Sequence, residues 1–255
     1  MKRRDFLKFV GLSAAVAGAV PGFMNKEVKA REYTPPPGAL TARRWGLAID
    51  LRKCWEHPDC RDCIEACHHV HNVPQIPDKK KEIKWIWKDE FEHVFPDKPN
   101  EFNDILLKGK SFLLLCNHCE HPPCVRLCPT QATFKREDGI VMMDYHRCIG
   151  CRFCMAACPF GARSFNWIDP RPYIEDPNPE FPTRMKGVVE KCLFCYERLE
   201  KGQKPACVEA CKCGALIFGD LEDENSEISR VLRSRFSIRR KPELGTGPSV
   251  FYLLG

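Results

Sequence analysis

The sequence lacks the residue patterns by which most hydrolases, nucleotide-binding proteins and nucleic-acid-binding proteins are recognised. No Ser-His-Asp set, phosphate-binding glycine loop or pair of catalytic carboxylates stands out in its 255 residues. A large excess of basic over acidic residues is also missing. The formal net charge is +6, and residues 1–30, with six Lys or Arg and two acidic residues, carry most of it. The nearly neutral remainder offers no extended basic surface. We therefore expect neither a small-molecule substrate nor a nucleic acid as a partner of this chain.

Long hydrophobic runs are missing too, except near the N-terminus. A basic start, MKRR, precedes an apolar stretch over residues 9–23 that is short for a bilayer span. Arg3 and Arg4 resemble the twin-arginine export motif, and the tripeptide VKA ending at Ala30 fits a cleavage site. We expect residues 1–30 to be a twin-arginine signal peptide and the protein to be extracytoplasmic, in the periplasm or its archaeal equivalent. An uncleaved hydrophobic anchor is the alternative.

Cysteine is what the sequence holds in abundance, with seventeen residues. The odd count, a chain long enough to bury its own core and the tight grouping of the cysteines all argue against a disulfide framework. All but Cys213 fall into four groups of four, in which three residues separate the last two cysteines. The groups are Cys54, Cys60, Cys63 and Cys67; Cys116, Cys119, Cys124 and Cys128; Cys148, Cys151, Cys154 and Cys158; and Cys192, Cys195, Cys207 and Cys211.

The third group, CIGCRFCMAACP, has the spacing of a bacterial ferredoxin. Three thiolates of a CxxCxxC loop can surround one face of a 4Fe-4S cluster, while the fourth cysteine, one helical turn later, points to a neighbouring cluster. Isolated CxxC pairs are also typical of structural zinc sites, so a structural zinc protein is the alternative. No CxxC pair is followed by His, so we expect no covalent haem in this chain.

The segments between the groups predict an α+β fold. Two β-prone runs on either side of a Glu-Asp-Gly turn predict a hairpin, and short apolar segments between third and fourth cysteines predict helical turns. The alternating aromatic segment EIKWIWKDEFEHVF predicts a strand that packs on the core. These segments are the hairpin strands 132–135 and 139–143, the helical turns 155–157 and 208–210, a returning strand 215–218, and the aromatic strand 82–95.

On these motifs, residues 44–220 resemble the NrfC- and DmsB-like family of four-cluster ferredoxin-like electron-transfer subunits. The resemblance implies an α+β fold of two interleaved, pseudo-symmetric bacterial-ferredoxin-like modules with long loops. It also implies that the chain relays single electrons through four 4Fe-4S clusters and is not catalytic alone. In that family the first group shares its clusters with the last, and the two middle groups share theirs.

The signal peptide, the lengthened first group, the HHVHNVP run and the C-terminal GTGPSVFYLL are most similar to one branch of the family. That branch is DsrO, the periplasmic iron–sulfur subunit of the Dsr-type transmembrane complex of sulfur metabolism, called in archaea the Hdr-like menaquinol oxidoreductase iron–sulfur subunit. The resemblance implies a hetero-oligomer with an NrfD-like integral-membrane, quinone-interacting subunit and a multihaem cytochrome c. The alternative is the electron-transfer subunit of a molybdopterin, nitrite or tetrathionate reductase.

Carried over to this sequence, the family pattern implies that each cluster takes three cysteines from one group and the last cysteine of another. The four implied ligand sets are Cys54, Cys60 and Cys63 with Cys211; Cys192, Cys195 and Cys207 with Cys67; Cys116, Cys119 and Cys124 with Cys158; and Cys148, Cys151 and Cys154 with Cys128.

Three features depart from the family pattern or stand beside it. Five residues separate Cys54 from Cys60 where the family usually has two, which makes Cys54 the least secure ligand. Cys213 follows the last group, and we interpret it as a buried spare thiol, since free cysteine is among the most buried residue types. The histidines of the segment 68–71 fit a solvated or hydrogen-bonded loop better than a metal site of their own.

The groups and connectors divide the chain into consecutive parts. The basic run RVLRSRFSIRRK fits a solvated face, or an arm that docks on an acidic partner or a membrane surface. After the signal peptide, we expect the first cluster group with wrapping segments at 31–110, a central two-cluster module at 111–190, the fourth group at 191–225 and a C-terminal docking extension at 226–255.

Overall fold

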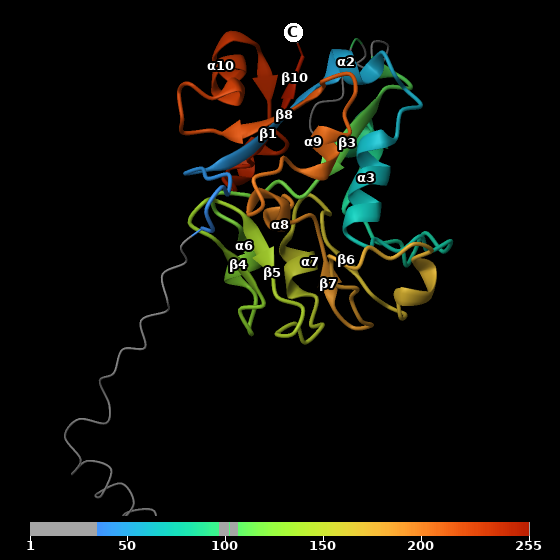
Figure 1. Ribbon diagram of the computed structural model, residues 1–255. Coiled ribbons are helices and arrows are strands. Elements are labelled where there is room, and N and C mark those ends of the chain that lie inside the picture. The colour runs from blue at the N-terminus through green and yellow to red at the C-terminus, as the bar shows by residue number, and fades with distance from the viewer. Residues whose placement is uncertain (1–34, 97–101, 103–106, 255) are drawn as a thin grey trace, which may run out of the picture. The chain divides into compact units, whose positions relative to one another are not determined.

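The computed structural model describes residues 35–96, 102 and 107–254 (Figure 1). The predicted signal peptide of residues 1–30 lies outside the described residues. None of the helices in the described part of the chain is long and apolar enough to cross a membrane.

The largest sheet joins the two ends of the described chain. β1 (Trp45–Asp50) is buried at all six positions, and it lies between β8, which runs antiparallel to it, and β10, which runs parallel to it. At the centre of the sheet, Leu47 faces Phe218 on one side and Val250 on the other. The order of the sheet is β8 (Leu216–Asp220), β1, β10 (Val250–Leu253) and β9 (Ser237–Ile238).

Helix α10 (Glu227–Ser234) packs on β8 and β1 (Figure 1). Its first turn is capped by Ser226, whose side chain accepts a hydrogen bond from Ser229 N at 3.2 Å. Buried Ile228 contacts a small apolar cluster with Ala48 and Leu253. Residues 226–254 therefore contribute to the core, and only their exposed side chains are available to a partner.

The described residues also form three antiparallel sheets of two strands each. The hairpin predicted over 132–143 is confirmed as β4 with β5, and the returning strand is confirmed as β8. The remaining pairs are β2 with β3 and β6 with β7. The bounds are β2 Ile86–Glu90, β3 Ser111–Leu115, β4 Thr133–Lys135, β5 Val141–Met143, β6 Ser164–Phe165 and β7 Val189–Glu190.

The aromatic segment 82–95 is only partly a strand. β2 ends at Glu90, and α4 (Phe91–Val94) follows at once. Phe91 and Phe95 lie one helical turn apart, with ring centroids 5.7 Å apart, and both contact Phe112 of β3. A helical turn therefore buries both rings on one face, whereas residues four apart in a strand would lie further from each other.

Short helices carry many of the cysteines. Four of them, α3, α6, α7 and α9, each contain the third cysteine of one group; α3 packs against α9, and α6 packs against α7. The helical turns predicted near 155–157 and 208–210 are thereby confirmed, the second ending one residue early. The bounds are α2 Leu51–Trp55, α3 Asp62–Val70, α6 Pro123–Arg126, α7 Phe153–Ala157, α8 Tyr196–Leu199 and α9 Ala206–Glu209, with 3-10 turns at Arg171–Tyr173 and Pro242–Leu244.

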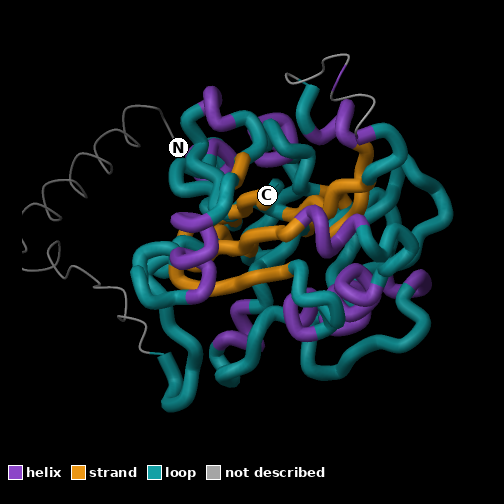
Figure 2. Tube along the Cα trace, turned by 90° about the horizontal axis from the view of Figure 1, so that it is seen from above, coloured by secondary structure: helices purple, strands orange, loops and turns teal. Residues whose placement is uncertain are grey.

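The predicted mixture of helices and strands is confirmed, and loops connect most of these short elements (Figure 2). A buried polar network ties the segment after α3 to the central part of the chain. The guanidinium of Arg184 pairs with the carboxylate of Glu190 at 2.7 Å and donates to the carbonyl oxygens of His71 and Asn72. Trp85 Nε1 donates to the same carboxylate at 2.9 Å. This network fixes the end of α3, and with it the position of the first cysteine group.

Candidate metal centres

All seventeen cysteines carry free thiols, and the fold gathers them into four places. We name each place after the first of the three cysteines that one group contributes: the Cys54, Cys116, Cys148 and Cys192 sites. Three of these sites are cavities lined by four cysteines each.

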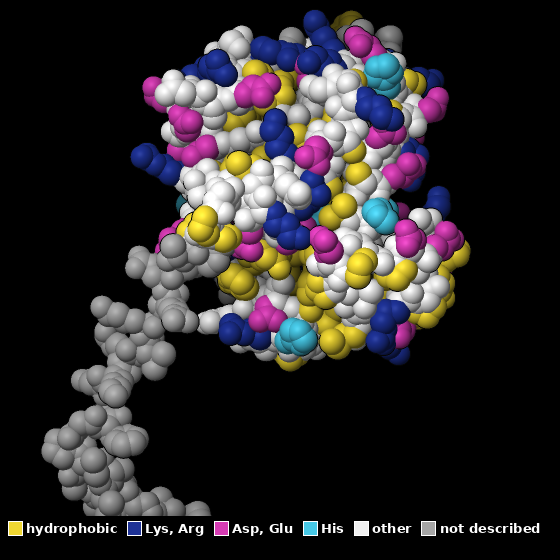
Figure 3. Space-filling view, in the orientation of Figure 1, with side chains coloured by type: hydrophobic (Ala, Val, Ile, Leu, Met, Phe, Trp, Pro, Cys, Tyr) yellow, Lys and Arg dark blue, Asp and Glu magenta, His cyan; other side chains and the backbone are white. Residues whose placement is uncertain are grey.

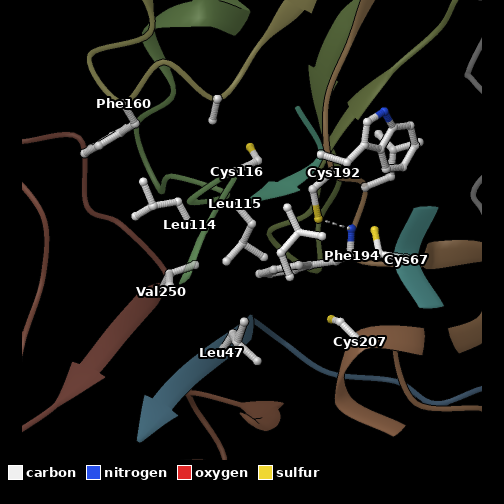
Figure 4. Packing of buried hydrophobic residues seen from close by; sticks show 14 of the residues in the cluster. Leu47, Cys67, Leu114, Leu115, Cys116, Phe160, Cys192, Phe194, Cys207 and Val250 are labelled. Carbon is white, nitrogen blue, oxygen red and sulfur yellow. Dashed lines mark hydrogen bonds between the residues drawn. The ribbon is translucent and has the colours of Figure 1, made fainter. Parts of the chain in front are cut away.

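The Cys192 site is a cavity lined by Cys192, Cys195 and Cys207 together with Cys67. Figure 4 shows Cys67, Cys192 and Cys207 converging from three separate segments: α3, the loop after β7, and α9. All four thiols are buried, and the rest of the lining is apolar, including Leu47 and Leu115. The structure therefore places Cys67 beside three cysteines of the fourth group.

The two middle groups exchange their last cysteines in the same way. The Cys116 site is lined by Cys116, Cys119 and Cys124 with Cys158. The Cys148 site is lined by Cys148, Cys151 and Cys154 with Cys128. The packing of α6 on α7 produces this exchange, because each helix follows the cysteine loop of one site and leads to the last cysteine of the other.

The Cys54 site gathers five thiols. Burial, followed by the charges of Cys54, Cys211 and Cys60, raises the pKa of Cys63 to about 12, so these four lie close together. Burial also raises the pKa of Cys54; Lys88 opposes this effect, while the charges of Cys213 and Cys211 add to it. Cys213 is half-buried rather than buried, and its Sγ lies 3.7 Å from Sγ of Cys211.

Several cysteine loops adopt a backbone conformation that turns N–H groups towards sulfur. His118, Gly150 and Phe194 each precede the second cysteine of a CxxC pair, and each has a positive φ, which is uncommon for residues other than glycine. The backbone N–H of Phe194 donates to Cys192 Sγ at 3.4 Å. At Gly150 a Cβ atom would collide with the carbonyl oxygen of Gly187, so this turn requires glycine.

The thiols fit 4Fe-4S clusters on both number and charge. Burial, chiefly, raises the pKa values of Cys119 and Cys192 to about 12 each, with repulsion from Cys116 adding to the effect. A thiol ligates metal as the thiolate, and four thiolates in one cavity repel one another unless a cationic centre lies between them. Four soft sulfur donors around an otherwise apolar cavity are the ligand set that an iron–sulfur cluster requires.

The histidines after the first cysteine group lie close to the Cys192 site. His71 is buried; its Nδ1 lies 2.9 Å from the carbonyl oxygen and 3.7 Å from Sγ of Cys67, and its Nε2 lies 2.8 Å from Oε1 of Glu197. His71 is thus hydrogen-bonded, as the sequence favoured, whereas His68 and His69 lie in the last turn of α3 and not in a loop. Hetero atoms of His71, Cys195 and Glu197 lie within 4.8 Å of one another, but Cys195 already belongs to the Cys192 site.

Two buried cations beside the thiols, Arg163 and Lys191, were missed by the sequence interpretation. Arg163 Nη2 donates to Cys124 Sγ at 3.0 Å and to Thr133 Oγ1 at 2.8 Å. Lys191 Nζ donates to the carbonyl oxygens of Val141 and Cys192. The sequence offered one signal for them: Arg163 follows Cys158 by five residues, and Lys191 immediately precedes Cys192.

The four sites differ in how far they are buried. All four cysteines of the Cys192 site and three of the Cys116 site are buried. In the Cys54 and Cys148 sites only one cysteine of each set of four is buried, namely Cys63 and Cys154. Two sites are therefore interior, and two reach towards the surface.

The cavities and comparison with known proteins together define an iron–sulfur electron-transfer protein. Residues 109–170 and 178–221 match the family described as the 4Fe-4S dicluster domain. The chain is 42% identical to the Hdr-like menaquinol oxidoreductase iron-sulfur subunit 1 of Archaeoglobus fulgidus, over 99% of this chain and 97% of that protein. It is 37% identical to a tetrathionate reductase subunit of Salmonella typhimurium, over 98% and 87% of the two chains.

A further relative is the menaquinone reductase iron-sulfur cluster-binding subunit of Nitratidesulfovibrio vulgaris, which is 37% identical over 82% of this chain and 88% of its own. The chain belongs to the family of ferredoxin-like iron–sulfur subunits of oxidoreductase complexes, as the cysteine pattern predicted. Such a subunit transfers electrons and is not catalytic alone.

Proposed function

We propose that this protein relays single electrons through four 4Fe-4S clusters, one at each cysteine site. The observation that carries the proposal is the place of Cys67, which lines the Cys192 site instead of joining the other cysteines of its own group. The same exchange relates Cys128 and Cys158. Each cluster, when bound, takes up one electron and passes it on without bond chemistry.

The fold supports two interleaved, pseudo-symmetric modules. In one, α3 packs on α9 and the first and last groups exchange cysteines; in the other, α6 packs on α7 and the middle groups exchange theirs. The outer module is thus built from segments at both ends of the chain, and the central module is continuous.

The residues around the sites would hold the clusters and exclude water. The thiolates supply the ligands, and the apolar lining of the Cys192 site, including Leu47, Leu115 and Phe218, would keep this interior site dry. A dry, low-dielectric surrounding strengthens the effect of nearby charges on the energy of an electron. The half-buried Cys54 and Cys148 sites are suited to exchange electrons with other subunits.

The surface near the Cys148 site supports a partner subunit at that end. Leu127, Ile149 and Phe153 are neighbours in sequence of its cysteines and are 54%, 67% and 58% exposed. On the face drawn in Figure 3, hydrophobic side chains gather in the lower part, while charges of both signs are interspersed above. Exposed apolar side chains that gather into one patch mark surfaces that other proteins cover.

The named relatives support a quinone-linked complex. Two of them are called menaquinol oxidoreductase and menaquinone reductase subunits. We propose that this chain serves a Dsr-type complex of sulfur metabolism, together with an NrfD-like membrane subunit and a multihaem cytochrome c. It would reach the periplasm, or its archaeal equivalent, by twin-arginine export and stay at the membrane through those partners.

A second candidate is the electron-transfer subunit of a molybdopterin or nitrite/tetrathionate-type reductase, which the similarity to the tetrathionate reductase chain favours. Anaerobic purification of the native complex separates the two candidates. Haem absorbance without a pterin cofactor supports the quinone–cytochrome complex, and a pterin cofactor without haem supports the reductase.

Analysis of iron and acid-labile sulfide in the same preparation tests the clusters themselves. About sixteen iron atoms per chain, four for each cluster, are expected. A colourless protein with stoichiometric zinc would instead establish the structural zinc alternative and overturn the proposal.

A further inference from the structure

Two of the buried cations in the described part of the chain, Arg163 and Lys191, form no ion pair with an acidic side chain. Arg163 is 5% exposed and Lys191 is fully buried. Among residues 35–96 and 107–254, no carboxylate oxygen lies within 4.0 Å of either side-chain nitrogen group. Arg184, which is equally buried, differs because Glu190 neutralises it at 2.7 Å.

An uncompensated buried cation is costly, so a negative charge elsewhere must stabilise these two. The groups that surround them are thiols. Arg163 Nη2 donates to Cys124 Sγ, its charge lowers the pKa of Cys154 against the larger effect of burial, which raises it, and its guanidinium remains protonated under all ordinary conditions. Lys191 Nζ donates hydrogen bonds to the carbonyl oxygens of Val141 and Cys192, and both acceptors favour its ammonium form.

Each cation lies at a junction between two sites. Arg163 lines the Cys116 site, and its charge also lowers the pKa of Cys154 in the Cys148 site. Lys191 donates to the carbonyl oxygen of Val141, which lines the Cys116 site, and to that of Cys192 in the next site. The Cys116 site is therefore flanked by both cations, and its two neighbours by one each.

The other sites have weaker or balanced positive charge. At the Cys192 site the carboxylate of Glu197 opposes Lys191, since it raises the pKa values of Cys192 and Cys195. Arg152 at the Cys148 site is exposed, and Lys88 at the Cys54 site is half-buried, so solvent screens both.

We propose that Arg163 and Lys191 make the Cys116 site the position of highest reduction potential among the four, so that an electron on the chain rests there. The inference rests on the proposed electron relay. Reduction adds one electron to a site whose thiolate ligands are already negative, with no bond made and no proton taken up. A fixed cation a few ångströms away stabilises that added charge more than it stabilises the oxidised site.

The first test is a potentiometric titration of the native complex, followed by EPR. The signal of each site is identified by a cysteine-to-serine variant, Cys119→Ser for the Cys116 site. We expect the signal with the highest midpoint potential to be the one that Cys119→Ser changes. Assignment of that signal to any other site would overturn the inference while leaving the electron relay intact.

The second test removes each charge. Arg163→Met should lower the midpoint potentials of the Cys116 and Cys148 signals, and Lys191→Met those of the Cys116 and Cys192 signals. The expected change is at least tenfold in the one-electron equilibrium, or about 59 mV. The Cys54 signal, remote from both cations, is the internal control and should not move.

Arg163→Lys is the matched variant, because it keeps the charge and loses the planar fork. It should hold both midpoint potentials close to those of the native protein. Unchanged potentials in Arg163→Met with a full iron content, or an equal change at all four sites, would contradict the inference. If the Met variants lose iron, the inference is tested by the first experiment alone, which ranks the four EPR signals of the native complex by midpoint potential. Missing clusters in the native protein would instead refute the proposed function.

Discussion

The imidazole ring of His118 stacks on the phenyl ring of Phe194, with ring centroids 3.7 Å apart and an angle of 19° between the planes. Both rings are buried, and both residues sit in cysteine loops with positive φ, 40° and 53° respectively. His118 Nδ1 accepts a hydrogen bond from Val141 N at 3.1 Å, and burial holds the pKa of His118 well below its usual range. A neutral aromatic pair therefore joins the loop of the Cys116 site to the loop of the Cys192 site.

Removal of this stack should loosen the contact between the two sites. Phe194→Ala deletes a buried ring beside the Cys192 cavity, and such changes typically cost about 3–5 kcal/mol. We expect a lower temperature for the thermal loss of cluster absorbance. Phe236→Ala, at a position that is 69% exposed, is the control and should leave this temperature almost unchanged. Equal losses in both variants would contradict the role of the stack.

The exchange of cysteines predicts which substitutions act on the same cluster. Cys67→Ser should change the EPR signal that Cys207→Ser changes, because both thiols line one cavity. Cys63 lies one helical turn before Cys67 on α3, but it belongs to the Cys54 site, so Cys63→Ser should change a different signal. The proposed ligand sets would be wrong if Cys67→Ser and Cys63→Ser changed one signal in common.

The fifth thiol of the Cys54 site should be dispensable. Cys211 keeps the three-residue spacing after Cys207 and is among the charges that raise the pKa of Cys63. We therefore expect Cys213→Ser to retain the native iron and labile sulfide content and all four EPR signals. If Cys213→Ser loses about four iron atoms while Cys211→Ser keeps the native iron content, Cys213 is the ligand and Cys211 is the spare thiol.

An ion pair between β1 and the segment after α10 predicts how stability depends on pH. Arg235 Nη1 lies 2.6 Å from Oδ2 of Asp50, whose side chain is 3% exposed. Burial alone would raise the pKa of Asp50, but hydrogen bonds from Arg235 and from the backbone of Lys53 outweigh it, and the pKa is lowered. Because the unfolded carboxyl group binds a proton more readily, the pair stabilises the fold fully above about pH 4, and this contribution is lost as the pH falls through the folded pKa.

Asp50→Asn should therefore lower the free energy of unfolding by about 1.5–3 kcal/mol at neutral pH, as expected for a hydrogen bond between charged groups. The difference in thermal midpoint between the native protein and this variant should stay constant from pH 8 to pH 5 and shrink only near pH 4 and below. Arg233→Gln, which removes an exposed pair with Glu224, should have little effect. A difference that vanished between pH 7 and pH 5 would point to another titrating group.

Local features were predictable from the sequence, and distant contacts were not. Cysteine spacing and the turn at Glu137–Gly139 act within a few residues, so the cysteine groups, the β4–β5 hairpin and the short helices were expected from them. The pairing of β10 with β1 depends on segments about 200 residues apart and has no local signal. The ligand exchange came from family resemblance, since spacing alone does not say which groups meet.

The buried cations show the same limit. A lysine before Cys192 or an arginine after Cys158 is ordinarily read as a solvated side chain. Only the folded chain, which places Arg163 against Cys124, 39 positions earlier, reveals that they lie among thiols. The strand predicted over residues 82–95 was too long, because the spacing of Phe91 and Phe95 suits a helical turn.

The place of β10 between β1 and β9 constrains the order of events during synthesis. A ribosome that has translated every cysteine of the four groups has still not produced residues 250–253, the middle of the largest sheet. Until that strand emerges, β1 has a free edge, and the start of the first cysteine group, which follows β1 directly, is held on one side only. Since unpaired edges invite misassembly, assembly of the Cys54 site should wait for the last stretch of translation, and a prematurely terminated chain should be unable to complete it.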